Sequence, residues 1–468
     1  MSEYNGHVGE FLKKVMSHIK YRSIHKTIED ELSVHIEEQK AEYIKRGIDE
    51  ENAAVKAIEQ MGDPDLVGKQ LNKAHSPRTE WSILIITFVI VILGGAVQFF
   101  LSGESIRNED LFFKYLFYAP IGILVFSCVY FFDYTLLGRH PKLVVCILLG
   151  AAIGGFYILE RRYGAFLHVY YISLLAIPVF GVVVYSLRGR GYLGIIGSGF
   201  FYAAIAFICI IGPRVYALGF FTLACVVIIT VAILKGYFNC NKRTGMAIAY
   251  VPMMLFGSLF LYYIIMSSPR RLIRLLTIFV PEVDPNGGGW QHIMVRRLIK
   301  SSKSIGEAVL YGDLSNTPIN QVLPCWDSDF ALTYIIVRLG YIAGFIIIAV
   351  LSILIIRMFI TILKQKNALG FLLSFSAFIA ISGQFMLYVL SNFGVVMTSV
   401  TLPFISYGGS AFVVNMMFLG LVMSVYRRSN IVDDKLRKGS VNNSKLITIE
   451  DGRIIIDFGI SELKRTHK

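Results

Sequence analysis

Residues 267–330 read SSPRRLIRLLTIFVPEVDPNGGGWQHIMVRRLIKSSKSIGEAVLYGDLSNTPINQVLPCWDSDF, and this polar stretch separates two long apolar parts of the chain. On either side of it, back to Trp81 and onward to Tyr426, apolar runs alternate with short polar links. A loop of this length inside a compact body is usually functional or disordered. Its aromatic residues, its isoleucines and a helical pattern from Trp290 to Ala308 argue against disorder. We therefore expect residues 267–330 to be ordered and to form the functional surface of the protein.

The composition excludes an ordinary soluble protein. Of 468 residues, 55% are hydrophobic and only 16% are charged, and the apolar residues come in runs of about 20, enough to cross a membrane as helices. The runs are too long and too uniformly apolar for barrel strands. We predict an all-α polytopic membrane protein with about ten spans, the long loop lying between the seventh and eighth. The predicted spans are 82–101, 111–132, 142–159, 168–187, 192–212, 216–235, 246–266, 331–360, 367–391 and 406–426.

The basic residues predict an orientation. Short links on one side carry most of the Lys and Arg, among them Arg188, Lys242 and Arg243. By the positive-inside rule these links are cytoplasmic, which places 267–330 outside and both termini inside. The same rule explains the net charge of +13 better than nucleic-acid binding does. We expect the first span to act as an uncleaved signal-anchor, and the six cysteines show no metal-ligand spacing.

Two polar regions flank the spans. Residues 1–80 predict a cytoplasmic bundle of short helices, with Ile28, Leu32, His35, Ile36, Tyr43 and Ile44 along one helical face. Asp63 is a plausible N-cap before Pro64. The region resembles the helical prefix domain that precedes the membrane part of some Firmicutes permeases. Residues 81–430 form the transmembrane domain, and the tail, 431–468, contains Asp451-Gly452 between β-branched runs, which predicts a β-hairpin.

Asp327 and Asp329 lie where the loop meets the next span. Partial desolvation there would raise a carboxyl pKa and suit it to general-base work. The alternative is that both are solvated residues at a helix start, with Asp327 or Ser328 as the N-cap.

Charged side chains near the loop could bind a phosphate. Arg296, Arg297, Lys300 and Lys303 recur at helical spacing and predict a basic face; a solvated face is the alternative. Arg338, nine residues after Asp329, is too far along a helix to pair with it. Because a buried charge is costly in a membrane, we expect Arg338 to pair with a polar group at 384–407 or, preferably, with the phosphate groups of a ligand; a structural salt bridge is the alternative.

The sharpest motif is TLPFISYGGS at 401–410. Pro403 breaks a preceding helix, and Gly408 and Gly409 allow close backbone approach. Gln384 and Asn392 add polar groups at membrane depth. On this chemistry alone the segment could also be the broken helix of a transporter.

This motif resembles the signature of the FtsW/RodA/SpoVE family of bacterial membrane proteins, also called SEDS proteins. Gly289-Trp290-Gln291 is similar to the family's Gly-Tyr-Gln, and PCWDSDF at 324–330 is similar to its Pro-Glu-x-His-Thr-Asp-Phe. The resemblance covers about 82–430 and is strongest from 285 on.

The resemblance implies polymerisation of lipid II, with Asp329 as the catalytic base. It implies no certain cofactor. Either cationic groups or a divalent cation (Mg²⁺ or Mn²⁺) would stabilise the leaving pyrophosphate. It implies lipid II, membrane lipids and a class B penicillin-binding protein as partners, in cell division, elongation or sporulation. The implied substrate-binding set is Gln291, Arg296, Arg297, Lys300, Lys303, Asp327, Arg338, Gln384, Asn392, Ser406, Tyr407, Gly408, Gly409 and Ser410.

The chain departs from the family pattern at several positions. Cys325 replaces the family's Glu, and Asp327 replaces its His. Val337-Arg338 replaces the Glu-Glu pair that follows in the family. Where the family has Arg-Trp-Ile … Gln-Pro-Ser-Glu, this chain has ERRYGAFLHVYYISLLAIP. Two alternatives therefore stay open: a lipid II flippase of the same fold, and a non-catalytic scaffold for a penicillin-binding protein.

Overall fold

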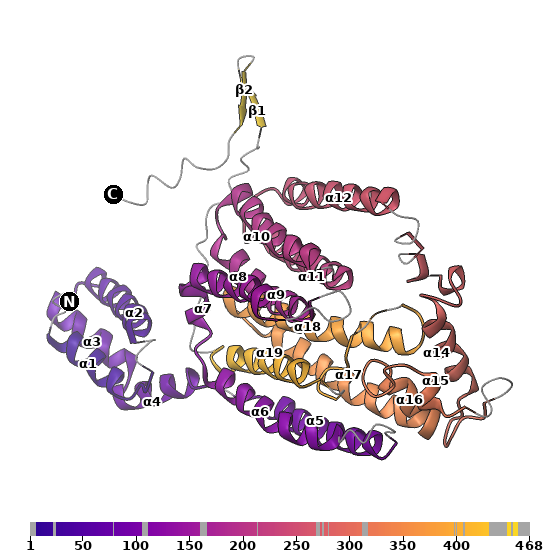
Figure 1. Cartoon of the computed structure of the whole chain (residues 1–468). Coiled ribbons are helices and arrows are strands. Elements are labelled where there is room, and N and C mark those ends of the chain that lie inside the picture. Colours follow the sequence, from indigo (N-terminus) through magenta and orange to yellow (C-terminus); the bar gives the residue numbers. More distant parts are fainter. Residues whose placement is uncertain are drawn as a thin grey trace. The chain divides into compact units, whose positions relative to one another are not determined.

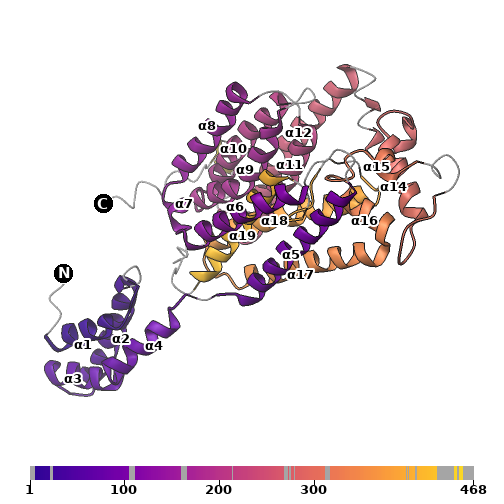
Figure 2. The same ribbon diagram turned by 60° about the horizontal axis from the view of Figure 1, so that its bottom comes forward.

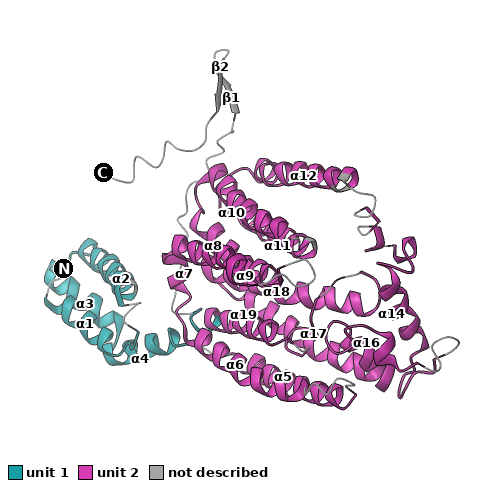
Figure 3. Ribbon diagram, viewed as in Figure 1, with its two compact units in different colours: residues 1–79, 426–435 teal, residues 80–425, 436–468 magenta. Residues whose placement is uncertain are grey.

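The computed structural model in Figure 1 contains two compact units, which Figure 3 colours separately: residues 1–79 with 426–435, and residues 80–425 with 436–468. The structure describes residues 6–21, 25–77, 79–104, 111–159, 166–212, 214–267, 272–273, 276–278, 280–310, 317–396, 398, 400–405, 408–429, 447–450 and 453–456.

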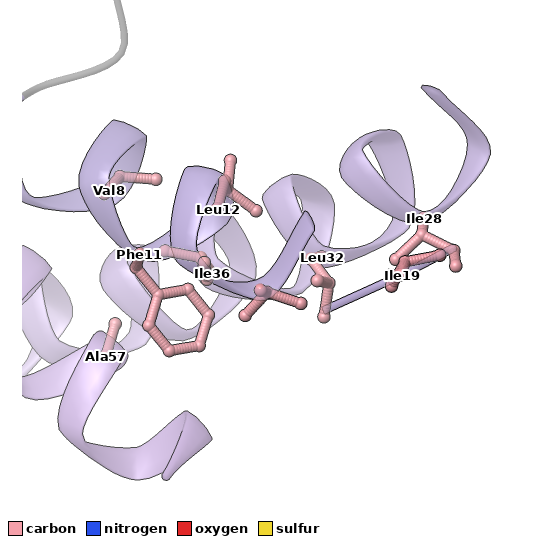
Figure 4. Close-up of a cluster of buried hydrophobic side chains, with 9 residues drawn as sticks. Val8, Phe11, Leu12, Ile19, Ile28, Leu32, Ile36 and Ala57 are labelled. Atoms are coloured by element: carbon pink, nitrogen blue, oxygen red, sulfur yellow. The ribbon is translucent and has the colours of Figure 1, made fainter. Parts of the chain in front are cut away.

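The first unit is a small helical bundle with its own core. Its helices are α1 (Gly6–Ser17), α2 (His25–Lys45), α3 (Glu50–Met61) and α4 (Pro64–Ala74). The Asp63 side chain caps α4, with Pro64 in the first turn, as the sequence predicts. The core, drawn in Figure 4, brings together Val8, Phe11, Leu12, Val15, Ile19, Ile28, Leu32, Ile36 and Ala57.

Part of the predicted helical face is wrong. Ile28, Leu32 and Ile36 are buried because four-residue steps keep them on one side of α2. His35 is one residue, or about 100°, away from Ile36 and is exposed, close to Glu38. Ile44 is also exposed. The first helix, α1, was not predicted, although it supplies four of these nine core residues.

The second unit confirms the ten predicted spans. Ten of its described helices are long and apolar enough to cross a membrane. They are α5 (Trp81–Gly103), α6 (Leu111–Phe131), α8 (Pro141–Ile158), α9 (Leu167–Ser186), α10 (Gly191–Ile211), α11 (Val215–Leu234), α12 (Lys242–Ser267), α17 (Tyr341–Leu363), α18 (Ala368–Asn392) and α19 (Gly409–Arg427). A short helix, α7 (Thr135–Arg139), links α6 to α8.

Helix α9 is at the centre of this unit. It packs against α8, α10, α11 and α18, and Figures 1 and 2 show it surrounded by them. Because successive spans reverse direction, the first turns of α9, α11 and α19 and the last turn of α18 lie at one end of the bundle. That end also carries residues 267–330, and we call it the loop-bearing end.

The described part of the loop contains η2 (Pro281–Val283), α14 (Trp290–Ser301) and α15 (Ile319–Val322). Helix α14 is shorter than the predicted Trp290–Ala308 because Ser302 is already extended.

The predicted span 331–360 is also wrong in one respect. It breaks at Gly340 (φ +96°) into α16 (Ala331–Leu339) and α17. Segment 303–308 runs beside the break. The N–H groups of Gly306 and Ala308 donate to Leu339 and Val337, and the carbonyl of Lys303 accepts from Tyr341. Backbone groups that the break leaves without helical partners are thereby satisfied.

In the tail, β1 (Ile447–Glu450) pairs antiparallel with β2 (Arg453–Ile456). The predicted turn residues Asp451 and Gly452 lie outside the described residues.

Candidate functional site

Asp329 lies directly before α16, beside the last turn of α18. The buried Asn392 holds it there: its Nδ2 donates to the carbonyl of Asp329 at 2.9 Å, and its Oδ1 accepts from the N–H and hydroxyl of Thr333, both at 2.9 Å. Tyr388 makes a further hydrogen bond to the start of α16: its hydroxyl accepts from the N–H of Leu332 at 3.0 Å. The Asn392 amide, predicted to bind substrate, is therefore engaged in positioning residues 329–333.

A tight turn brings the two aspartates to this position. Cys325 has a left-handed backbone (φ +54°), and its carbonyl accepts from the N–H groups of Ser328 and Phe330. Asp327 is half-buried and accepts a hydrogen bond from Ser328 Oγ at 3.3 Å. The N-cap of α16 is Phe330, which makes no side-chain cap bond. The alternative in which Asp327 or Ser328 caps the helix is therefore wrong.

Three tyrosines from two helices lie near enough to Asp329 to feel its charge, and we call Tyr170, Tyr171 and Tyr216 the tyrosine cluster. The rings of Tyr170 and Tyr216 lie 5.6 Å apart between centroids. The charge of Asp329 interacts with the hydroxyl groups of all three. The half-buried carboxylate of Asp329 thus lies beside several hydroxyl groups at the loop-bearing end, a suitable setting for a general base that must take a proton from a sugar hydroxyl.

The polar residues of α18 and α19 join the cluster. Tyr170 donates to Gln384 Oε1 at 3.4 Å, and Gln384 Nε2 donates to Asn415 Oδ1 at 3.1 Å. The hydroxyl groups of Ser410 and Tyr171 are hydrogen-bonded. Gln384 and Ser410, both predicted site residues, are therefore brought together with the tyrosine cluster.

A cation also contacts the tyrosine cluster. Arg214, the N-cap residue of α11, donates from Nε to the carbonyl of Phe166 and from Nη1 to the hydroxyl of Tyr216, each at 3.3 Å. Its charge also interacts with Tyr171. The charges of Asp329 and Arg214 therefore both act on the hydroxyl groups of Tyr171 and Tyr216.

The predicted basic face is only partly formed. Arg296 donates to the carbonyl of Gly394 at 2.6 Å and pairs with Glu282 at 2.9 Å. Arg297 and Lys300 are exposed on α14, and Gln291 is half-buried on the same helix. Lys303 lies beyond the end of α14, so it does not belong to the helical face as predicted.

The expected partner of Arg338 is wrong. Its guanidinium pairs with Glu104 at 2.6 Å and with Glu307, and these carboxylates raise the pKa of Arg338 further. Neither partner is a polar group at 384–407 or a substrate. This pairing could not be predicted from the sequence, because Glu104 and Glu307 are far from Arg338 along the chain.

The signature segment is held from two sides. Buried Gln98 of α5 donates to the carbonyl of Ile405 at 2.7 Å, and Phe404 adopts a left-handed backbone (φ +68°). Gly409 opens α19, and a Cβ there would lie 2.4 Å from the ring of Tyr118, which bears out its predicted close approach. Gly408 is half-buried. Ser406 and Tyr407 lie outside the described residues.

Sequence reasoning missed the tyrosine cluster and Arg214. A usable signal was present: adjacent tyrosines begin one apolar run, and Arg-Val-Tyr begins another, both at span ends where polar groups are costly. Among the described residues no group of three or more His, Cys, Asp or Glu comes together, and no step is assigned to a divalent cation.

The comparisons with known proteins bear on this site. The profile of the FtsW/RodA/SpoVE family, described as "Cell cycle protein", matches residues 190–431, more than half of the chain. The chain belongs to the FtsW/RodA/SpoVE family. With its ten apolar helices it is a multi-pass membrane protein.

Curated relatives match over a shorter range. The chain is 30% identical over 175 residues to stage V sporulation protein E of Bacillus subtilis, covering 36% of this chain and 44% of the relative. It is 33% identical over 168 residues to a probable peptidoglycan glycosyltransferase FtsW of Wigglesworthia glossinidia brevipalpis, covering 34% of this chain and 42% of the relative. It is 29% identical over 171 residues to peptidoglycan glycosyltransferase MrdB of Escherichia coli K12, covering 36% of this chain and 44% of the relative. The chain thus spans less than half the length of these relatives.

The family fold recurs in a solved structure. A chain in the structure titled "Structural coordination of polymerization and crosslinking by a peptidoglycan synthase complex" superposes with a TM-score of 0.59 at 16% identity, covering 76% of this chain and 99% of that chain. At this identity the likeness supports the fold alone.

Proposed function

We propose that this FtsW/RodA/SpoVE protein is a peptidoglycan glycosyltransferase that polymerises lipid II. The observation that carries the proposal is the position of Asp329, which is held by Asn392 and lies beside the tyrosine cluster. Asp329 is also the residue that the family motif identifies as the base. Two of the curated relatives are named a probable peptidoglycan glycosyltransferase FtsW and peptidoglycan glycosyltransferase MrdB.

The reaction follows from these groups. The carboxylate of Asp329 takes the proton of the acceptor sugar's 4-hydroxyl, and that oxygen attacks the anomeric carbon of the donor. The bond between this carbon and the pyrophosphate oxygen breaks as the glycosidic bond forms. The electron pair leaves with undecaprenyl pyrophosphate, whose negative charge must be stabilised by cationic groups.

We further propose that residues 267–330 face the outside of the cell membrane and that both termini are cytoplasmic. The asymmetry of basic residues supports this orientation. It places Asp329 on the side where glycan strands are assembled. A class B penicillin-binding protein is the proposed partner, because polymerised strands must then be cross-linked.

The test is polymerisation of lipid II by the purified protein, with and without a class B penicillin-binding protein from the same organism. General-base catalysis contributes about 10²- to 10⁴-fold in rate, so Asp329→Asn should slow polymerisation by that factor with folding intact. Asp327→Asn, the matched control, should have a milder effect. Equal loss in both variants would indicate a shared structural role instead.

Two outcomes would contradict the proposal. Transport of lipid II across vesicles without polymer would favour a flippase. Recruitment of the penicillin-binding protein with no polymer from wild type would favour a scaffold.

A further inference from the structure

We propose that Arg214 is the residue that binds the pyrophosphate of the polyprenyl-linked donor. This inference rests on the proposed function, because it assigns the leaving group of that reaction to a particular side chain. The sequence favoured Arg338 and the basic residues of the loop for this role, and the structure points to a different cation.

The first step concerns which cations already have a partner. Arg338 pairs with Glu104 and Glu307, so its charge is more than neutralised. Arg296 pairs with Glu282 and donates to Gly394. Among the residues that the structure describes, Arg214 pairs with no carboxylate; its acceptors are a carbonyl and a phenol. Its positive charge is therefore available to an anion.

The second step concerns position. Arg214 contacts Tyr216, whose ring packs against Tyr170, and Tyr170 is linked to Gln384 and Asn415. The charge of Asp329 interacts with the same Tyr216. A donor bound against this cluster would have both the base and the guanidinium near it. This is the arrangement that displacement requires, because proton removal and departure of the anion occur on different atoms.

The third step concerns chemistry. A guanidinium carries five N–H donors in a planar fork that matches phosphate oxygens. Two of the nitrogens of Arg214 already make bonds, which fix the orientation of the group, and the remaining N–H donors can reach an anion. An unneutralised arginine at the end of a membrane helix is costly, and an anionic ligand would offset that cost.

The experiment measures binding rather than turnover. Full-length wild type, Arg214→Gln and Arg214→Lys, in detergent, are titrated with undecaprenyl pyrophosphate and, separately, with undecaprenol. Wild type should prefer the pyrophosphate. Arg214→Gln should reduce that preference by about 10- to 100-fold, since charged hydrogen bonds of this kind are lost. Arg214→Lys should keep part of it, and Arg139→Gln, an exposed arginine at the other end of the bundle, should keep all of it.

A second measurement needs no variant, so it holds even where Arg214→Gln does not fold. Phenylglyoxal modification of Arg214 in wild type, followed by mass spectrometry, should slow in the presence of undecaprenyl pyrophosphate but not undecaprenol. Equal protection by both lipids, or an unchanged preference in Arg214→Gln, would overturn the assignment.

The two proposals can fail separately. If Arg214→Gln loses the preference for pyrophosphate but wild type forms no polymer, the binding role of Arg214 is supported and the proposed glycosyltransferase activity is contradicted. Polymerisation by wild type, with equal preference in Arg214→Gln, would contradict the binding role alone.

Discussion

Three arginines at the loop-bearing end show how local partners decide what a charged residue can do. Arg338 has two carboxylates and Arg296 has one. Arg214, among the described residues, contacts only neutral acceptors. Residue type alone cannot separate these cases, because each partner comes from a distant part of the chain. The role of Arg338 consequently changes from substrate binding to structure.

Replacing Arg338 by Gln should lower the thermal stability. The change leaves the carboxylates of Glu104, 27% exposed, and Glu307, 56% exposed, without the cation that they share. Since the groups are partly exposed, the loss should be modest, about 2–4 °C in Tm. Thermal unfolding in detergent measures it.

The double variant Arg338→Gln/Glu307→Gln is the matched control and should recover part of the loss, because it removes one of the two unpaired charges. Unchanged stability in Arg338→Gln, together with weaker binding of undecaprenyl pyrophosphate, would restore the original prediction that Arg338 binds substrate.

A buried histidine gives a pH dependence of known sign. Burial lowers the pKa of His292 in α14. A histidine whose pKa is lower in the folded protein than in the unfolded chain binds protons less readily in the folded state. Its contribution to folding stability is complete above the unfolded pKa, about 6.5, and is lost as the pH falls below that value. Wild type should therefore lose more Tm than His292→Gln on going from about pH 8 to pH 5. Parallel pH profiles of the two proteins would show that His292 contributes nothing.

At the scale of the element, the break between α16 and α17 sets the position of the site. Gly340 has a φ of +96°, and a Cβ there would lie 2.6 Å from the carbonyl oxygen of Ser304. An L-residue in such a conformation costs about 1–3 kcal/mol, and the contact adds to that. Gly340→Ala should therefore lower Tm and disturb the end of α16, the helix that begins two residues after Asp329.

Gly150→Ala in α8 is the matched control, since a Cβ added at Gly150 would meet nothing within 4 Å. It should be neutral or slightly stabilising, because Ala favours helix over Gly by up to about 1 kcal/mol. Equal Tm values for the two variants would mean that the backbone at Gly340 relaxes freely.

The same break shows what sequence patterns can and cannot predict. Run length placed all ten spans because crossing a membrane is a local requirement that each segment must meet alone. The break at Gly340 was not predictable, since residues 303–308, far from it along the chain, satisfy its backbone groups. Asp329 could be predicted from a motif. The tyrosines at the start of two apolar runs indicated polar groups at a span end, but only the packing of α9 against α11 brings Tyr170 and Tyr216 together.

At the scale of the whole molecule, the two units have separate cores. The first buries its own apolar residues, such as Phe11, Leu12 and Ile36, and none of the candidate site residues belongs to it. Deletion of residues 1–78 should therefore leave membrane insertion and lipid II polymerisation per molecule unchanged, and should alter abundance, localisation or dependence on a partner. A correctly inserted truncation that no longer polymerises lipid II would contradict this.

Orientation is the property on which the proposed mechanism depends most, and native cysteines offer a direct test. Cys325 is exposed in the loop, four residues before Asp329, whereas Cys240 lies between α11 and α12, at the other end of the bundle. In single-cysteine variants, a membrane-impermeant maleimide added to intact cells should label Cys325, and Cys240 should react only after permeabilisation. Asn286→Cys, in an exposed part of the loop, is a second outer probe and should behave like Cys325.

Tags after residue 80 and at Lys468 should report cytoplasm in the same cells. The reverse labelling pattern would place Asp329 and Arg214 on the cytoplasmic side, where lipid II is made rather than polymerised. Both proposals for the site would then fail together, whatever the activity of neighbouring residues, because base and cation lie at the same end of the bundle.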